Sequence, residues 1–404
     1  MSKFICSLFL VFSSALCNAQ QVTAGHYNIY LDADFISTKA ASESISQGIE
    51  SALSEVNFTI MGYKFEIHSK NHQGNSLRSK QNLEQFLKDP HALLVFSGLH
   101  SPPILANQKF INNNKILLLN PWAAAAPITR TIQSENWIFR LSIDDSKAGY
   151  IITEHAVKQG FIEPFLLLED TGWGKSNAKT MTIALEKAGL TPRGITWFNW
   201  GLGKNHASIL LRDIADSGAD VIFFVGNASE GKILAQAMSE LPAQYRLPIR
   251  SHWGITGGDF TRVITPNIRK NLDIEFIQTS FSFLNPMLNP FQRSVLKNAI
   301  HHFPEFNSVY DIQVQSGFVH AYDLTKLLIA AIEQSGLTGN VIEDRQAIKD
   351  ALENLQKPVV GLIKTYQKPY SKYTIKTPDA HEALGSSDYT MGFYGSKNEV
   401  ILLN

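Results

Sequence analysis

Short apolar runs alternate with amphipathic segments along the chain, and this alternation most constrains its fold. Buried strands are predicted at 27–31, 93–96, 116–119, 165–168, 195–198, 221–225, 248–250 and 276–279. Helices are predicted at 42–55, 77–87, 146–159, 175–188, 207–217, 230–241 and 313–334. Ile45, Ile49 and Leu53, for example, recur at helical spacing, so one face of that helix can pack on a sheet. The pattern predicts an α/β fold with parallel sheets covered by helices on both faces.

Ligands of such sheets bind at the carboxyl ends of the strands. Five loops at these ends are rich in small residues: "SGLHSPP", "NPWAAAAP", "EDTGWG", "GNASEG" and "SHWGITGG". Three of them carry a tryptophan, namely Trp122, Trp173 and Trp253. We expect these indole rings to line one cleft, where they stack on a planar ligand or hold a cation. The alternative is that each ring fills a gap between two lobes.

Polar side chains in the same loops are candidates for orienting a ligand. They are His100, Ser101, Glu169, Asp170, Asn227, Glu230 and His252. Ser101 can donate to an anionic oxygen, together with backbone N–H groups of the helix that follows. The three carboxylates are candidate partners for a positive ligand group. Their alternative role is that of solvated residues at helix starts, favoured by the helix dipole.

Catalytic motifs are incomplete. The Gly-Lys-Ser at 174–176 resembles the end of a phosphate-binding loop, but the position that needs a glycine is Glu169. "GNASEG" has one residue too many before its serine for a nucleophile elbow. No HExxH zinc motif occurs in the sequence. We therefore expect no catalytic residues, no metal and no cofactor; an amide hydrolase using His100 or Ser101 is the remaining enzymatic alternative.

The first residues resemble a secretory signal peptide at 1–19. A lysine precedes an apolar run, and Cys17 and Ala19 occupy the −3 and −1 positions of a cleavage after Ala19. Lipid attachment at Cys17 is the alternative. Both cysteines, Cys6 and Cys17, fall in this segment, so we expect no disulfide in the mature chain and a periplasmic location.

The charge of the chain is balanced, with 36 basic and 36 acidic residues. Removal of the predicted signal peptide takes away only Lys3 from this count. No basic stripe indicates a nucleic-acid partner, and no later apolar run is long enough to predict a membrane span.

Several segments together resemble the substrate-binding proteins of branched-chain amino acid and amide transporters, which have the type I periplasmic binding fold. They are "DADFISTKAASESISQGIESALSEVN", "SGLHSPPILA", "LNPWAAAAPIT", "FRLSIDDSKAGYI", "LLLEDTGWGKSNAKTM" and "HAYDLTKLLIAAI". The resemblance implies two doubly wound lobes joined by a hinge of three crossings. Lobe I is expected at 24–143 plus 277–356, and lobe II at 144–276 plus 357–404.

The same resemblance implies roles for site residues. Ser101 and the backbone of Ala123 and Ala124 are expected to hold a ligand carboxylate, and Trp173 is expected to close over the ligand. Two positions depart from the family. Ala124 lacks the usual threonine hydroxyl, and Trp253 stands near the place of the acid that pairs with a ligand ammonium. These changes favour stacking or cation–π contact over ion pairing.

The function expected is capture of a small polar or aromatic ligand (amino-acid-like, amide or cationic) for delivery to the membrane permease of an ABC transporter. The alternative is a periplasmic sensor coupled to a membrane kinase or chemoreceptor. We expect a monomer that binds no nucleic acid.

Overall fold

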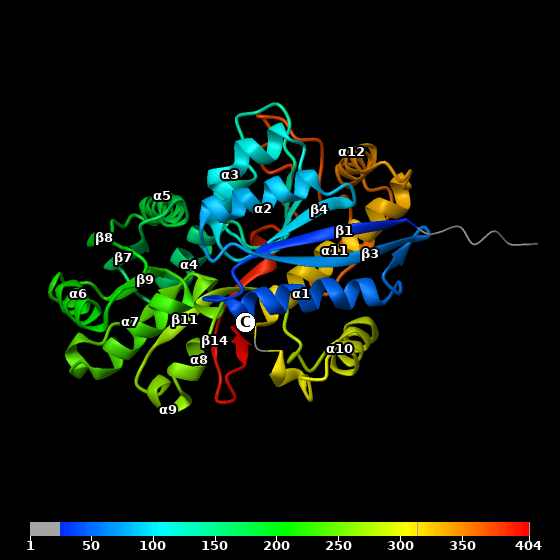
Figure 1. The fold of residues 1–404 in the computed structure, drawn as a ribbon. Helices are drawn as coiled ribbons and strands as arrows, with labels where there is room; N and C mark the ends of the chain where they lie inside the picture. The colour runs from blue at the N-terminus through cyan, green and yellow to red at the C-terminus, as the bar shows by residue number, and fades with distance from the viewer. Residues whose placement is uncertain (1–24, 313, 404) are drawn as a thin grey trace, which may run out of the picture.

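A computed structural model describes residues 25–312 and 314–403 and contains two large sheets (Figure 1). The predicted signal peptide at 1–19 lies outside these residues. The strands of the first sheet are, in spatial order, β2 (Thr59–Ile60), β3 (Tyr63–Asn71), β1 (His26–Ala33), β4 (Ala92–Ser97), β5 (Leu118–Asn120) and β6 (Ile138–Arg140). All pair in parallel except β2 with β3.

The second sheet has a parallel centre and an antiparallel edge. Its order is β15 (Val400–Leu402), β14 (Tyr389–Tyr394), β11 (Ile274–Thr279), β10 (Ile249–Ser251), β9 (Val221–Val225), β7 (Pro164–Glu169) and β8 (Gly194–Phe198). Only β14 and β15 run antiparallel to their neighbours. Strands β4, β7 and β9 are buried along their whole length, as expected for strands covered on both faces. A third, two-stranded sheet joins β12 (Val359–Val360) to β13 (Thr365–Tyr366).

Helices cover both faces of each large sheet (Figure 1). On the first sheet, one face carries α1 (Lys39–Ser54) and α11 (Gln315–Ser335), and the other carries α2 (Ser76–Lys88) and α3 (Ser101–Asn113). On the second sheet, α4 (Asp145–Lys158) packs with α5 (Gly172–Lys187), and α6 (Lys204–Asp216) packs with α7 (Ala228–Glu240). The remaining helices are α8 (Phe260–Val263), α9 (Pro266–Arg269), α10 (Pro290–His302) and α12 (Val341–Leu352).

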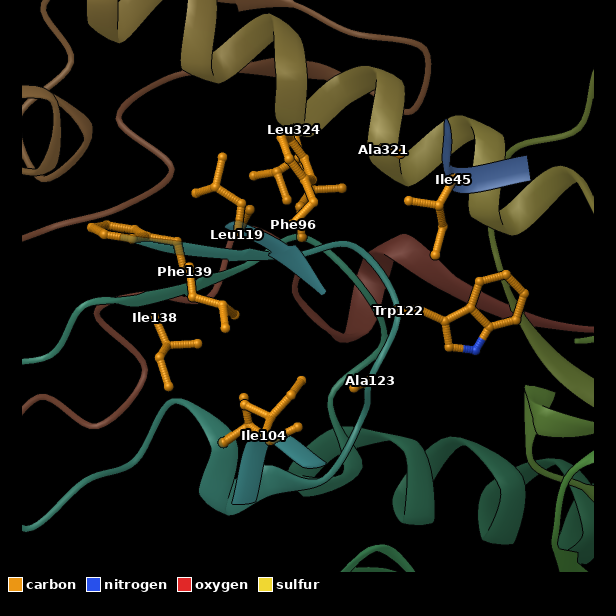
Figure 2. Packing of buried hydrophobic residues seen from close by; sticks show 14 of the residues in the cluster. Ile45, Phe96, Ile104, Leu119, Trp122, Ala123, Ile138, Phe139, Ala321 and Leu324 are labelled. Atoms are coloured by element: carbon orange, nitrogen blue, oxygen red, sulfur yellow. The ribbon is translucent and has the colours of Figure 1, made fainter. Parts of the chain in front are cut away.

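The core of the first sheet runs continuously from its helices to the loops at its strand ends. Ile45 of α1 and Ala321 of α11 pack over the sheet beside Phe96 of β4, and Trp122 lies at the end of this cluster (Figure 2). Trp122 is therefore held by the same packing that stabilises the fold. None of the described helices combines the length and the apolarity needed to cross a membrane.

The α/β prediction is confirmed, and each predicted strand overlaps a strand of the structure. One helix differs in a way that matters for function: α5 begins at Gly172, three residues before the predicted start at Lys175. The Thr171 hydroxyl accepts a hydrogen bond from the backbone N–H of Gly174 and so caps the earlier start. Trp173 consequently lies in the first turn of a helix and not on a loop.

The chain passes three times between the two sheet-and-helix layers. It passes from β6 to α4, from β11 to α11, and from α12 to β14. β11 extends to Thr279 within the second sheet, slightly beyond the predicted lobe boundary at 276. The lobe boundaries themselves stay a prediction.

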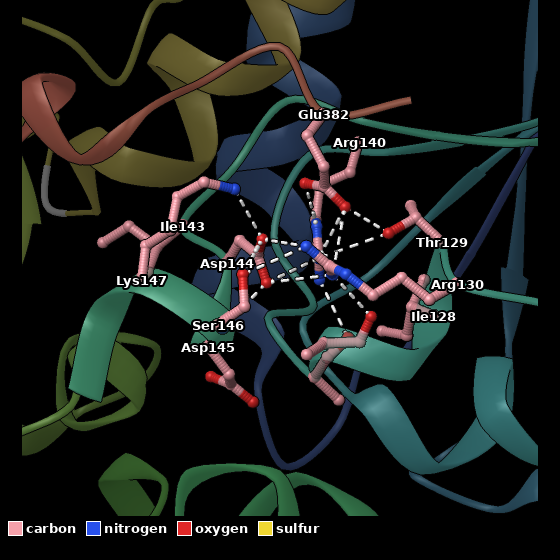
Figure 3. Close-up of polar contacts among 12 residues, drawn as sticks. Ile128, Thr129, Arg130, Arg140, Ile143, Asp144, Asp145, Ser146, Lys147 and Glu382 are labelled. Carbon is pink, nitrogen blue, oxygen red and sulfur yellow. Dashed lines mark hydrogen bonds and ion pairs between the residues drawn. The ribbon is translucent and has the colours of Figure 1, made fainter. Parts of the chain in front are cut away.

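A buried cluster of charged residues fastens two of these passages together (Figure 3). Arg140, at the end of β6, donates from Nε and Nη2 to the Glu382 carboxylate at 2.8 and 2.7 Å. Its Nη2 also lies 3.0 Å from Oδ1 of Asp144, the residue that caps α4. Arg130 forms a second ion pair with Asp144. Burial acts to lower the pKa of Arg140. The negative charges of Glu382 and Asp144 outweigh this effect and raise the pKa, so the guanidinium remains charged.

Candidate ligand-binding site

Strand-end loops of both large sheets converge on one small cavity. The first sheet contributes residues after β4 and β5, and the second contributes residues after β7, β9 and β10. The lining residues are Leu99, His100, Ser101, Pro102, Trp122, Ala124, Glu169, Trp173, Asn227, Trp253 and Gly254. The cavity volume is about 10 Å³, which is the size of about one water molecule. The two sets of loops are therefore packed closely together.

Trp122 and Trp253 face each other across the two sheets. Trp122 follows β5, whereas Trp253 begins the 3₁₀ turn η3 (Trp253–Thr256) after β10. Their ring centroids are 5.0 Å apart at an interplanar angle of 32°. The rings are tilted toward each other, at a centroid distance within the range of about 4.5–7 Å typical of aromatic pairs. A planar or cationic group placed between the loops would contact an indole from each sheet.

The side chain of Trp173 donates a hydrogen bond to the buried carboxylate of Asp145. Its indole N–H lies 3.3 Å from Oδ1 of Asp145, and its ring stands edge-on to His252 with centroids 5.1 Å apart. His252 Nε2 lies 2.9 Å from the same Asp145 oxygen. Burial raises the pKa of Asp145, against the opposing effect of His252. Asp145 and His252 thus orient Trp173, and His252 itself does not line the cavity.

Glu169 is the carboxylate that lines the cavity. It ends β7 with almost no solvent exposure, accepting hydrogen bonds from Asn227 Nδ2 at 3.0 Å and Thr171 Oγ1 at 3.1 Å. Burial raises its pKa to about 7, although the side chains of Trp200 and Thr171 act in the opposite direction. The site therefore holds a carboxyl group that changes its charge near neutral pH.

The first sheet provides the other polar side of the cavity. His100 directly precedes α3, and its Nε2 lies 3.4 Å from Oδ2 of the buried Asp34. Ser101 Oγ accepts a weak hydrogen bond from the backbone N–H of Ala125 at 3.3 Å. Ala124 lines the cavity, and its carbonyl accepts the N–H of Asp145.

Four other predicted site residues lie outside the cavity lining: Ala123, Asp170, Glu230 and His252. The Ala123 carbonyl accepts hydrogen bonds from Asn120 and Arg140, which turn it inward. Asp170 is exposed and pairs with Lys175. Glu230 is buried elsewhere, where its Oε1 accepts the N–H of Gly201 at 3.1 Å.

Trp200, which follows β8 in the loop "FNWGLG", was not among the predicted site residues. This indole packs across the two layers, with its ring centroid 5.4 Å from that of His100. A Cβ added at Gly74 would lie 3.3 Å from the same ring. The signal was present, because strand 195–198 was predicted and a tryptophan beside glycine follows it. Asp145 gave no such signal, since an acidic residue at a helix start is common.

Gly174 is required where α5 starts against β7. A Cβ added there would lie 1.8 Å from the Glu169 carbonyl oxygen. We expect Gly174→Ala to lower the free energy of unfolding by about 1–3 kcal/mol, because the helix must move away from the strand. Urea unfolding measures this change. Gly203→Ala is the control, since a Cβ there meets nothing within 4 Å, and we expect under about 1 kcal/mol. Equal effects would refute the steric argument.

Comparison with known proteins places this geometry in a family. A family model for periplasmic binding proteins matches residues 37–244, more than half of the chain. A Leu/Ile/Val-binding protein homolog from Brucella melitensis biotype 1 is 22% identical over 333 residues, covering 81% of this chain and 82% of its own.

Solved structures agree on the fold. A type 1 periplasmic binding protein from Bordetella pertussis Tohama I has a TM-score of 0.75 at 16% identity, covering 94% of this chain and 99% of its own. The leucine-binding protein LivK from Thermotoga maritima MSB8 has a TM-score of 0.73 at 13% identity, covering 94% and 98%. A solute-binding protein of an ABC transporter from R. palustris, in complex with benzoate, has a TM-score of 0.72 at 15% identity, covering 94% and 96%. The chain belongs to the periplasmic binding protein family, and its fold is that of the type I periplasmic binding proteins.

Proposed function

We propose that this protein captures a small polar or aromatic solute (amino-acid-like, amide or cationic) outside the cytoplasmic membrane and delivers it to the permease of an ABC transporter. The observation that carries the proposal is the cavity lined by strand-end loops of both sheets, with one indole from each sheet in a tilted ring pair. The family supports it, because the similar proteins include ABC-transporter solute-binding proteins, one in complex with benzoate and one with Leu.

Capture requires the two sets of loops to separate. Pockets for small ligands usually have volumes of about 300–1,000 Å³, whereas this cavity measures about 10 Å³. A ligand that contacts Trp122 on one side and Trp173 and Trp253 on the other binds the closed arrangement better than the open one. Ligand binding thereby shifts the population toward closure.

A thermal-shift screen with amino acids, amides, aromatic acids and amines tests capture. We expect a true ligand at 100 times its Kd to stabilise the folded protein by about 2.7 kcal/mol. Small-angle X-ray scattering with that ligand tests closure, and we expect the radius of gyration to fall. A ligand that stabilises the protein but leaves the scattering unchanged would contradict the closing movement. Absence of any stabilising compound across the screen would contradict capture of these solute classes.

A further inference from the structure

The cavity lining contains a buried carboxylate and no lysine or arginine among the described residues. Glu169 is the only acidic residue of this described lining, which includes one histidine, His100. The side chains that act as donors to the Glu169 carboxylate, those of Asn227, Thr171 and Trp200, are all neutral. A carboxylate has about four lone-pair sites, so these bonds leave capacity for a ligand donor. A buried carboxylate without a cationic partner costs free energy, which a positive ligand group would offset.

The opposite side of the cavity offers few backbone donors to an anion. Anions bind at helix N-termini through free backbone N–H groups. At the start of α3, however, Pro102 and Pro103 follow Ser101 directly and have no N–H to offer. Nε2 of His100 lies 3.4 Å from Oδ2 of Asp34, whereas Nδ1 of the same ring has no hydrogen-bond partner among the described residues. An incoming carboxylate would find the Ser101 hydroxyl and the His100 ring there, but no N–H from Pro102 or Pro103.

The apolar lining suits an organic cation. Three indoles line the cavity, those of Trp122, Trp173 and Trp253. An indole face attracts a cation within about 6 Å of its centroid, and tryptophan is the best of the aromatic residues for this contact. The rings and the Glu169 carboxylate lie on the same small space, so a single positive group can use both.

On the basis of the proposed capture function, we propose that the ligand is a small organic cation without a carboxylate, its positive group on Glu169 and its apolar part on the indoles of Trp122, Trp173 and Trp253. This chemistry differs from that of the relatives crystallised with benzoate or Leu. It follows from the two prolines at the start of α3 and from a buried acid whose hydrogen-bond donors are all neutral. The same cavity would disfavour benzoate, because its carboxylate would meet Glu169 without a compensating cation.

The ionisation of Glu169 adds a pH signature. Its pKa is raised to about 7 by burial, and the titratable groups that act on it are His100, just before α3, and Glu230 of α7. A bound cation favours the ionised carboxylate, so binding releases a proton where the free site is protonated. Affinity for a cation should therefore rise from pH 6 to pH 8, a range in which a primary alkylamine keeps its proton.

Calorimetry with benzylamine, benzoate and benzyl alcohol on the purified full-length protein tests the inference, because these probes share one ring and differ in charge. We expect benzylamine to bind at least about tenfold more tightly than benzoate, as hydrogen bonds to charged groups contribute about 1.5–3 kcal/mol. Glu169→Gln should weaken benzylamine at least about tenfold and remove its pH dependence, whereas benzoate should not weaken. Glu169→Asp keeps the charge and should retain the preference for benzylamine.

The neighbouring residue provides a matched control. Asp170 is exposed and paired with Lys175, so Asp170→Asn should leave all three affinities unchanged. Benzoate binding as tightly as benzylamine in the wild type would overturn the cation inference and leave the capture function standing. Loss of benzylamine binding in Asp170→Asn equal to that in Glu169→Gln would also overturn it. No heat from any probe, together with no hit in the thermal-shift screen, would overturn both the inference and the capture function.

Discussion

Replacing Arg140 with methionine is expected to lower the free energy of unfolding by about 3–5 kcal/mol. The guanidinium is fully buried and pairs with Glu382 and Asp144, both of which are also buried. Methionine fills similar space but leaves Glu382 without its main counter-ion and Asp144 with one partner fewer. A buried charge that has lost its partner costs far more than a surface charge in water.

Chemical unfolding followed by circular dichroism measures this effect. Arg193→Met is the matched control, because Arg193 forms a solvent-exposed pair with Glu163. Such pairs contribute about 0–1 kcal/mol. If both variants lost the same small amount, the buried cluster would not stabilise the connection between the layers.

Replacing Trp173 with alanine is expected to have two effects. The affinity for a captured ligand should fall at least about tenfold, because one aromatic wall of the cavity is removed. The free energy of unfolding should fall by about 3–5 kcal/mol, because the ring is 94% buried, with 6% relative exposure, and donates to Asp145. The sequence predicted that α5 begins at Lys175, which would place Trp173 on a loop. Because α5 begins at Gly172, the ring is packed at the start of a helix, and its removal also lowers the free energy of unfolding.

Trp197→Ala is the control for both effects. Trp197 lies on β8 with 39% of its surface exposed and does not line the cavity. We expect the Trp197→Ala variant to bind the captured ligand with the same affinity as the wild type. Trp173→Phe separates the two roles further, since it keeps a smaller aromatic ring in the cavity and removes the N–H donor to Asp145. Unchanged ligand affinity in Trp173→Ala would remove this residue from the site.

The sequence predicted the elements whose apolar residues are continuous or regularly spaced. Strand β9, for example, was predicted at 221–225, because each of its residues is apolar and buried. Strand β3 was missed, since its sequence "YKFEIHSKN" alternates charged with apolar residues and much of it is exposed. A continuous apolar run predicts a strand well when both faces of that strand are buried, whereas a strand with an exposed face has a mixed sequence that is easily missed.

Neighbouring site residues show where sequence reasoning stops. Glu169 and Asp170 were equal candidates, because sequence does not show at which residue a strand ends. In the structure β7 ends at Glu169, which faces the cavity, and Asp170 turns toward Lys175 in solvent. Contacts between distant segments, such as Asp145 with His252, depend on the packing of α4 against β10 and left no local pattern. The ligand roles of the three tryptophans stay predictions until binding is measured.

The charged residues around Arg140 have a consequence for how the protein would open. They join the segment that leaves β6 to the segment that contains Glu382. During opening, these two segments would therefore rotate together as one unit. The described residues of the third passage, from β11 to α11, take part in none of these ion pairs. The changes of backbone dihedral angle during opening would then concentrate in the residues that flank this charged cluster and in the third passage. The contacts within the charged cluster itself would be kept.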